Sequence, residues 1–357
     1  MADLLYKDDF DAARDRLTTW WDGGDIGRPP IQLSIPRQKV REDLPSMARP
    51  DGWITGYSTS NYDFRVYCAR HACAWAEFLA EAVPAVSPDL GPNTLALFLG
   101  CRGVDAQDTV WVEPFIDDPA KATFVVQRDN FYYDFFWRLA NESLRLGRGK
   151  FLVCYPDLIE GLDTLAAMRG TEPLLMDMME RPDWVHQCLR QITTRYFEVY
   201  DEMYDAFKDD RGGTVFWAWA PGRMAKLQCD FSAMISAEMF GEFMMPVLRE
   251  MTGKLDYCMY HWDGANALQH HDHLLSLPRL TMLQWTPGAG QPGPSDPKWW
   301  PMHHKSLDAG KKLILGASKS EMLALKKEFG KQFKDIMLNM WAETPGEADE
   351  IIKLASD

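Results

Sequence analysis

Two short segments of the chain combine residue types that could do acid–base or metal chemistry. In the segment Tyr260–Gly264, an imidazole and a carboxylate stand two residues apart. Alternate residues of a strand point to the same side, so His261 and Asp263 face together if the strand continues through them. Such a pair suits either a metal site or two groups that exchange a proton. We therefore treat His261 and Asp263 as candidate catalytic and metal-binding residues.

The second segment is rich in carboxylates. Asp157, Glu160 and Asp163 follow an apolar run at intervals of three residues, which brings them close together if a loop here enters a helix. A cluster of this kind can share protons or bind a cation. Acids at such positions also cap helices, which is the structural alternative. Asp157 and Glu160 are the catalytic candidates of this segment, and Glu160 is also a candidate metal ligand.

Other residues that stand at the ends of predicted strands are candidate substrate contacts. An arginine can hold a carboxylate through two parallel hydrogen bonds, although a surface ion pair would explain it as well. Tryptophans can wall a ring-shaped substrate or simply fill the interior. A lone cysteine suits burial better than metal binding, and a glutamine can hydrogen-bond a substrate. The candidates are Arg37, Tyr155, Trp217, Trp219, Cys229, Gln284 and Trp285.

The elements that position these residues repeat along the chain. Short apolar runs, each followed by a stretch of helical periodicity, are typical of parallel strands covered by helices. Eight such units predict a (β/α)₈ barrel, in which the residues after each strand carry the chemistry. The predicted strands are Ile31–Ile35, Leu95–Gly100, Phe151–Tyr155, Thr214–Trp219, Tyr257–His261, Thr281–Trp285, Lys312–Gly316 and Asp335–Met340. A further run, Thr109–Phe115, predicts a hairpin.

The pattern predicts one domain over residues 1–357. The last four strands precede helices at 265–276, 298–309, 319–329 and 346–355, and Ser318 and Thr344 stand where N-caps are expected. Residues 1–90 form an N-terminal elaboration with helices over Asp9–Trp21 and Asn61–Ala82. A doubly wound sheet fits less well, because Pro36 removes a backbone donor where a phosphate-binding turn needs one.

The composition argues against several classes of protein. The net charge is −14, and such a surface repels nucleic acids and anionic membranes. Seven cysteines without a CxxC pair predict reduced thiols and a cytoplasmic protein. The first residues lack the basic start and apolar run of a signal peptide, and no apolar run reaches the roughly 18 residues of a membrane helix.

The segment Gln228–Phe240, with Phe243 and Pro246 after it, resembles a signature of the uroporphyrinogen decarboxylase superfamily. Leu162–Gly170 is similar to a mid-chain motif of that family, and Tyr260–Gly264 to its next strand. The resemblance implies a (β/α)₈ barrel and either decarboxylation or methyl transfer to or from a corrinoid protein, often with zinc. The N-terminal substrate motif of the decarboxylases is missing, so the methyltransferase branch fits better.

Within that branch, the resemblance implies a zinc site. His261 matches the first ligand of the zinc motif, but Asp263 stands where the motif has a cysteine, and the third cysteine is also missing. Oxygen ligands bind zinc as well, so the expected set is His261, Asp263 and Glu160. Asp157 and Glu160 would orient or protonate the leaving oxygen, and Trp217, Trp219 and Trp285 would stack on the substrate's ring.

The implied reaction moves a methyl group between a small methylated compound, such as an aryl methyl ether, and a corrinoid on a separate protein. Two other functions stay open. A cofactor-free decarboxylase or other lyase would hold a small carboxylated substrate with Arg37 and use Asp157 as a proton relay. A binding protein that kept the barrel would take up its ligand without turnover. Members of the family often form homodimers, which leaves that assembly open here.

Overall fold

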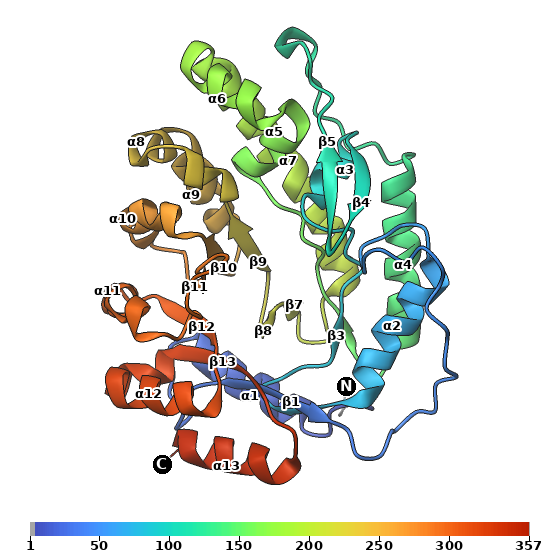
Figure 1. Cartoon of the computed structure of the whole chain (residues 1–357), viewed down its shortest axis with the longest axis vertical. Coiled ribbons are helices and arrows are strands. Elements are labelled where there is room, and N and C mark those ends of the chain that lie inside the picture. The colour runs from blue at the N-terminus through green and yellow to red at the C-terminus, as the bar shows by residue number, and fades with distance from the viewer. Residues whose placement is uncertain (1–3, 357) are drawn as a thin grey trace.

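The computed structural model describes residues 4–356, and its centre is a mostly parallel sheet of seven strands (Figure 1). The strand order is β2-β1-β13-β12-β11-β10-β9, and only the β1–β2 pair is antiparallel. The strands are β1 (Ile31–Pro36), β2 (Ala76–Ala80), β9 (Met224–Gln228), β10 (Tyr257–Asp263), β11 (Met282–Thr286), β12 (Lys312–Gly316) and β13 (Ile336–Trp341). The protein is therefore of the mixed α/β class.

Three short two-stranded sheets accompany the central one. They are the parallel pair β3 (Ala85–Val86) and β6 (Leu152–Val153), the hairpin β4 (Arg102–Ala106) and β5 (Thr109–Glu113), and the hairpin β7 (Thr214–Phe216) and β8 (Ala218–Ala220). One backbone hydrogen bond of 3.2 Å, from the Tyr155 N–H to the Val215 carbonyl, ties the end of β6 to β7. The β4–β5 hairpin confirms the one predicted around Thr109–Phe115.

Helices lie around the outside of the strands (Figure 1). They are α1 (Phe10–Trp21), α2 (Tyr62–Trp75), α3 (Thr94–Phe98), α4 (Phe131–Gly147), α5 (Gly161–Arg169), α6 (Thr171–Glu180), α7 (Pro182–Phe207), α8 (Ala237–Met239), α9 (Met245–Lys254), α10 (His271–Leu275), α11 (Trp300–Asp308), α12 (Lys319–Phe329) and α13 (Pro345–Ser356). Ser318 caps α12 in a capping box with Glu321, as its position before the helix predicts. In the described part of the chain, no helix is long and apolar enough to cross a membrane.

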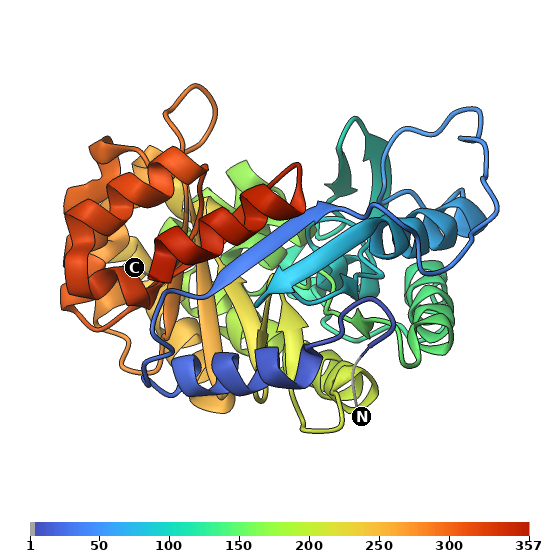
Figure 2. The same ribbon diagram turned by 90° about the horizontal axis from the view of Figure 1, so that it is seen from below.

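Helix α1 covers the ends of the strands that face away from the candidate site (Figure 2). Its buried residues pack in one cluster with Met224, Met282 and Met337, which stand at or near the first residues of β9, β11 and β13. Trp21 also donates from Nε1 to the Trp219 carbonyl at 2.8 Å. The amino ends of the strands are thus sealed by apolar packing, which leaves their carboxyl ends for polar residues.

The structure differs from the sequence-based prediction at four places. Residues 95–100 are not a strand but belong mainly to α3, since a short buried apolar run has no periodicity that separates helix from strand. The run Thr214–Trp219 forms a hairpin, and the strand that pairs with β10 is β9, which was not predicted. The predicted helix Asn61–Ala82 ends at Trp75 and continues as β2. The strand predicted from Phe151 is only two residues long.

These differences change the predicted architecture. The sequence predicts eight strands in one closed barrel, whereas strand pairing joins seven strands of the described chain into the central sheet. The seventh of these is β2, an antiparallel strand from the N-terminal elaboration. The last four β/α repeats are confirmed in β10 to β13, because their apolar runs and helix caps are regular.

A buried carboxylate holds the start of the sheet. Glu81 accepts hydrogen bonds from Arg28 at 2.7 and 2.9 Å, from Arg16 at 2.6 Å and from the Ile31 N–H at 2.8 Å. Burial alone would raise the pKa of Glu81, but these partners hold it below its ordinary value. Glu81 is therefore ionised at neutral pH, and it joins the end of β2 to α1, to the loop before β1 and to the first residue of β1.

We expect Glu81→Gln to lower the free energy of unfolding by about 3 kcal/mol at pH 7, because it leaves two arginines without their buried partner. A group with a depressed pKa stabilises the fold above its ordinary pKa, and that contribution is lost as the pH falls through the depressed value. The gap between wild type and variant should therefore shrink below about pH 4. Urea unfolding measures both, with Glu77→Gln on β2 as the control, and an equal loss in the control would contradict the assignment.

Candidate functional site

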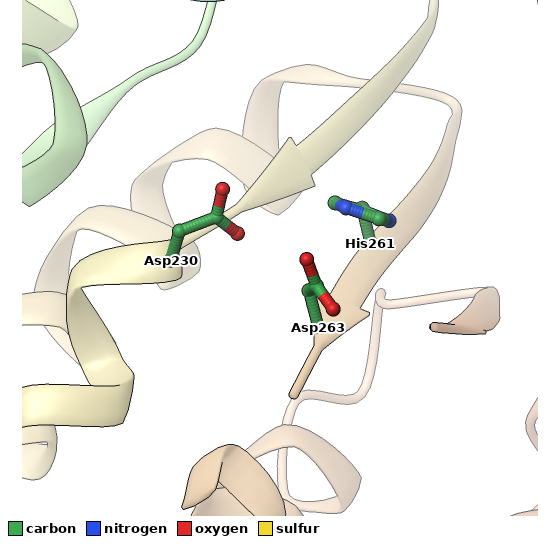
Figure 3. Close-up of side chains that lie close together, drawn as sticks. All are labelled: Asp230, His261 and Asp263. Atoms are coloured by element: carbon green, nitrogen blue, oxygen red, sulfur yellow. The ribbon is translucent and has the colours of Figure 1, made fainter. Parts of the chain in front are cut away.

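Three potential metal ligands meet at the carboxyl ends of β9 and β10. His261 and Asp263 lie on β10, and Asp230 follows β9 by two residues (Figure 3). One ligand atom from each lies within 4.8 Å of the others. They converge because β9 and β10 are parallel neighbours in which His261 pairs with Gln228. The Asp263 Oδ1 atom is buried and has no hydrogen-bond partner, so it is an acceptor that lacks a donor or a cation.

A hydrogen bond fixes the orientation of the His261 ring. Its Nδ1 lies against Oε1 of Gln284, the residue opposite it on β11. The Gln284 amide nitrogen donates to the Trp285 carbonyl at 3.2 Å and to the Thr286 hydroxyl at 3.0 Å, so the Gln284 oxygen must face the ring. Nδ1 therefore carries the hydrogen, and the lone pair of the neutral ring is on Nε2.

Trp217 packs edge-on against the same imidazole. The ring centroids of Trp217 and His261 are 5.4 Å apart at an interplanar angle of 83°. Trp217 forms the turn between β7 and β8 with a φ of +54°, a conformation that bulky residues rarely adopt. Its side chain is 46% exposed. Burial, and then the positive charge of Lys226, lower the pKa of His261, which keeps the imidazole neutral at pH 7.

A buried lysine stands beside this group. Lys226 on β9 forms an ion pair with Asp157 and donates to Oε1 of Gln228, and its side chain is only 1% exposed. Its ammonium nitrogen also lies 5.5 Å from the Phe216 ring centroid and 5.9 Å from that of Trp217. The ion pair compensates the cost of burying the ammonium group.

Gln228 links three carboxylates of the cluster. Its backbone N–H donates to Glu160 at 2.9 Å, and its side-chain amide donates to Asp163 at 3.1 Å and to Asp230 at 3.2 Å. Asp163 accepts two more hydrogen bonds of 2.8 Å, from the N–H groups of Asp230 and Phe231. Asp163 therefore holds the turn that carries Asp230 toward β10.

The cluster has more carboxylates than positive charges. Burial, opposed in part by Gln228 and Lys226, raises the pKa of Glu160 to about 8. Burial and then the charge of Asp163 raise the pKa of Asp230 to about 7. Next to Asp157, burial and the Asp157 charge likewise raise the pKa of Asp89 to about 7. Several of these groups therefore carry protons near neutral pH unless a cation binds.

A cavity of about 410 Å³ opens beside Asp163, Gln228 and Asp230. Its other walls come from the β4–β5 hairpin, from α5 and from the turn after β9. The remaining lining residues are Pro92, Asn93, Thr109, Val110, Trp111, Val112, Pro114, Ile159, Ala166, Ala167, Gly170, Thr171, Phe231 and Met234. The volume suits a small organic molecule.

The structure brings most of the predicted catalytic residues together but changes the metal set. Asp157 and Glu160 belong to the carboxylate cluster, and His261 and Asp263 lie beside it. In place of Glu160, the residue that joins His261 and Asp263 is Asp230. Glu160 is completely buried and accepts its hydrogen bond from the Gln228 backbone instead.

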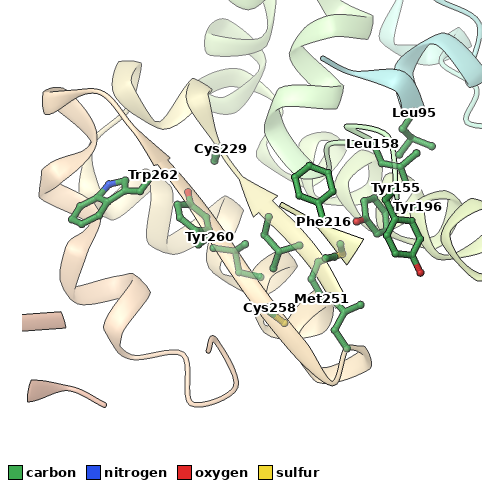
Figure 4. Packing of buried hydrophobic residues seen from close by; sticks show 14 of the residues in the cluster. Leu95, Tyr155, Leu158, Tyr196, Phe216, Cys229, Met251, Cys258, Tyr260 and Trp262 are labelled. Atoms are coloured by element: carbon green, nitrogen blue, oxygen red, sulfur yellow. The ribbon is translucent and has the colours of Figure 1, made fainter. Parts of the chain in front are cut away.

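Four predicted substrate contacts lie in the hydrophobic core instead of facing the cavity. Tyr155 stacks on Tyr200 with ring centroids 4.7 Å apart, and Cys229, directly after β9, is buried elsewhere in the same large cluster (Figure 4). Trp219, the middle residue of β8, is buried and donates from Nε1 to Asp209 at 2.9 Å. Trp285 packs between the rings of Trp262 and Trp299. Their positions correspond to the alternative in which large side chains fill the interior.

Arg37, another predicted substrate contact, bonds to backbone groups away from the candidate site. Its guanidinium donates to the Tyr6 carbonyl at 3.0 Å and to the Ala76 carbonyl at 3.1 Å, which fixes the N-terminal residues onto β2. Of the predicted substrate contacts, Trp217 and Gln284 are the two that contact His261. The structure gives Arg37 a structural position rather than a place in the cluster.

Sequence reasoning missed Lys226, Gln228 and Asp230. The signal was present, because the segment Ala225–Asp230 alternates buried apolar residues with Lys226, Gln228 and Asp230. Alternation of this kind is typical of a strand with one polar face. No protein-family model matches the chain, and a search of curated proteins gave no significant match. The site is therefore interpreted from its own geometry.

We expect Glu160→Gln to change how stability depends on pH. Because the folded pKa of Glu160 is about 8, against an ordinary value of 4.5, the folded chain binds one more proton than the unfolded chain between these values. Wild-type stability should therefore fall as the pH rises from 5 to 8, on the order of a few kcal/mol, and this fall should be smaller in the variant. Urea unfolding at both pH values measures it, with exposed Glu172→Gln as control. Parallel pH profiles would contradict the raised pKa.

Proposed function

We propose that the protein is a metal-assisted methyltransferase that moves a methyl group between a small methylated compound and a corrinoid on a partner protein. The observation that carries the proposal is the group Asp230, His261 and Asp263 beside a cavity of ligand size. The resemblance to the uroporphyrinogen decarboxylase superfamily supports the choice of methyl transfer. We also infer a (β/α)₈-type barrel, in which the parallel pair β3 and β6 completes the ring begun by the parallel strands β9 to β13 and β1.

The residues present fit a divalent metal such as zinc. Catalytic zinc sites use three nitrogen or oxygen ligands and leave a further position open. Asp230, His261 and Asp263 would supply these ligands, and the buried Asp263 oxygen without a partner is an acceptor that a cation would satisfy. Metal-binding imidazoles are usually oriented by a hydrogen bond at the nitrogen that does not bind the metal. Gln284 supplies this hydrogen bond to His261. A bound zinc ion would act as a Lewis acid toward the heteroatom that carries the methyl group.

The remaining residues would position the substrate and control protons. Lys226 forms an ion pair with Asp157 at the edge of the cluster and would fix the position of that side chain. Glu160, with a pKa of about 8, keeps its proton at neutral pH and does not add negative charge. Trp217, which is half exposed, packs edge-on against His261 and would shield one side of the imidazole. The corrinoid partner would approach at this carboxyl end, since α1 seals the opposite end.

A lyase that acts on a carboxylated substrate has less support. Its expected anchor, Arg37, donates to the Tyr6 and Ala76 carbonyls. Among the described residues, those lining the cavity beside Asp230 include no lysine, arginine or histidine. A substrate carboxylate would therefore lie against Asp163 and Asp230 without a basic partner.

We expect the protein to bind one Zn²⁺ through Asp230, His261 and Asp263. His261→Ala and Asp230→Asn should each weaken zinc binding by about 100-fold, and Gln284→Leu by about 10-fold, because it removes only the orienting hydrogen bond. Glu160→Gln should bind zinc as the wild type does, since Glu160 is outside the group. Calorimetry with a competing chelator measures these affinities, and His304→Ala is the matched control. Unchanged affinity in His261→Ala would reject the site.

We further expect methyl transfer to Co(I) corrinoid. Purified zinc-loaded protein, Co(I) cobalamin and a panel of methoxylated aromatic, methylated thiol and methylated amine donors should give methyl–cobalt absorbance with at least one donor. His261→Ala should abolish the signal, and His304→Ala should retain it. A panel in which no donor gives methyl–cobalt would count against the proposed reaction, and ligand binding without turnover would favour a binding protein.

A further inference from the structure

The cavity beside the proposed metal group is lined by acidic side chains but by no basic ones. Its charged lining residues are Asp163 and Asp230, and its described lining contains no basic side chain. Gln228 contributes an amide whose nitrogen already donates to both of these carboxylates. The polar end of the cavity therefore presents two carboxyl groups, and no basic side chain, to whatever enters it.

The nearest buried cation is already paired. The Lys226 ammonium contacts Asp157 and the Gln228 oxygen, and its side chain is 1% exposed. It is not among the residues that line the cavity. An anion placed there would lose part of its hydration beside two carboxyl groups with no free positive partner, which is unfavourable. A cation would gain from the same two carboxylates.

The rest of the lining is apolar and aromatic. Trp111 on the β4–β5 hairpin is 68% exposed, Phe231 is buried in the turn after β9, and Met234 lies at the rim. Aromatic faces next to carboxylates are the surroundings in which methylated ammonium groups are bound, through cation–π attraction and burial of the methyl groups. Neutral and anionic rings gain only the apolar part of this lining.

We propose that the part of the substrate that occupies this cavity is an organic cation, such as an N-methylated ammonium group. The inference rests on the proposed function only in taking the cavity as the substrate pocket. It replaces the ring of an aryl methyl ether with a cationic group, while the heteroatom that reacts lies toward Asp230, His261 and Asp263. Asp163 lines the cavity, accepts three hydrogen bonds from N–H groups and is not one of the three potential metal ligands, so its carboxyl group is the acidic partner left for the organic cation.

Choline and its uncharged isostere 3,3-dimethylbutan-1-ol test this directly, because they share shape and differ in charge. Ligand-observed NMR and calorimetry on the full chain should show choline binding at least about 10-fold more tightly than the alcohol, both after chelation and with zinc added. Trp111→Leu should weaken choline binding about 3- to 10-fold without affecting the fold, since its side chain is exposed. Trp75→Leu, at a similarly exposed tryptophan on α2, is the matched control and should bind choline as the wild type does.

The outcomes separate the two proposals. Equal affinity for choline and the alcohol, or preferential binding of 4-methoxybenzoate, would overturn the cationic pocket even in a protein that binds zinc and methylates cobalt. Selective choline binding that is lost in Trp111→Leu but kept in Trp75→Leu would support it, even if zinc binding and cobalt methylation both failed. Choline binding unaffected by Trp111→Leu would place the ligand outside this cavity and reject the inference.

Discussion

The candidate site depends on one arrangement, in which β9 places Lys226 and the Gln228 amide among closely packed carboxylates. Like charges at such short distances must be paired, protonated or bound to a cation. Lys226 pairs with Asp157, and Gln228 donates three hydrogen bonds, to Glu160, Asp163 and Asp230. Removing β9 from this position would leave buried acceptors without donors. Strand β9 therefore determines both the charge pairing of the site and the packing at the carboxyl ends of the strands.

Strand periodicity explains which parts of the site the sequence predicts. His261 and Asp263 alternate on β10, and the parallel register places Gln284 directly opposite His261, so a correct strand assignment gives their side of the sheet. The contact between Gln284 and His261 can therefore be predicted from the register alone. Asp230 was not predicted because the apolar run at 214–219 was taken as the strand. That run instead folds back on itself at Trp217 and forms a hairpin. Two runs within fifteen residues compete, and pattern alone does not choose between them.

The same limit explains the errors in the first half of the fold. The last four β/α repeats have apolar runs, caps and loops that agree with one another, and all four are found. Residues 95–100 are apolar and fully buried whether helical or extended, so their α-helical state depends on packing that sequence does not display. The size of a side chain likewise does not tell whether it lines a ligand pocket or packs in the core. Trp217 and Trp219 are two residues apart, yet Trp217 contacts His261 and Trp219 is buried and bonded to Asp209.

The two proposals for the site both depend on the excess of carboxyl groups over positive charges, but they use different carboxyl groups. Asp263 has a buried oxygen without any partner and lies with His261 and Asp230, so this side of the cluster can satisfy a metal ion through direct ligands. Asp163 has its oxygens occupied by three N–H donors, so it belongs to the wall of the cavity rather than to the potential metal ligands. A bare metal prefers the first environment, whereas a methylated ammonium, which has no strong hydrogen-bond donors, tolerates the second beside an aromatic wall. The division of hydrogen bonds around Gln228 thus separates a coordinating half of the site from a purely electrostatic half, and one substrate can use both.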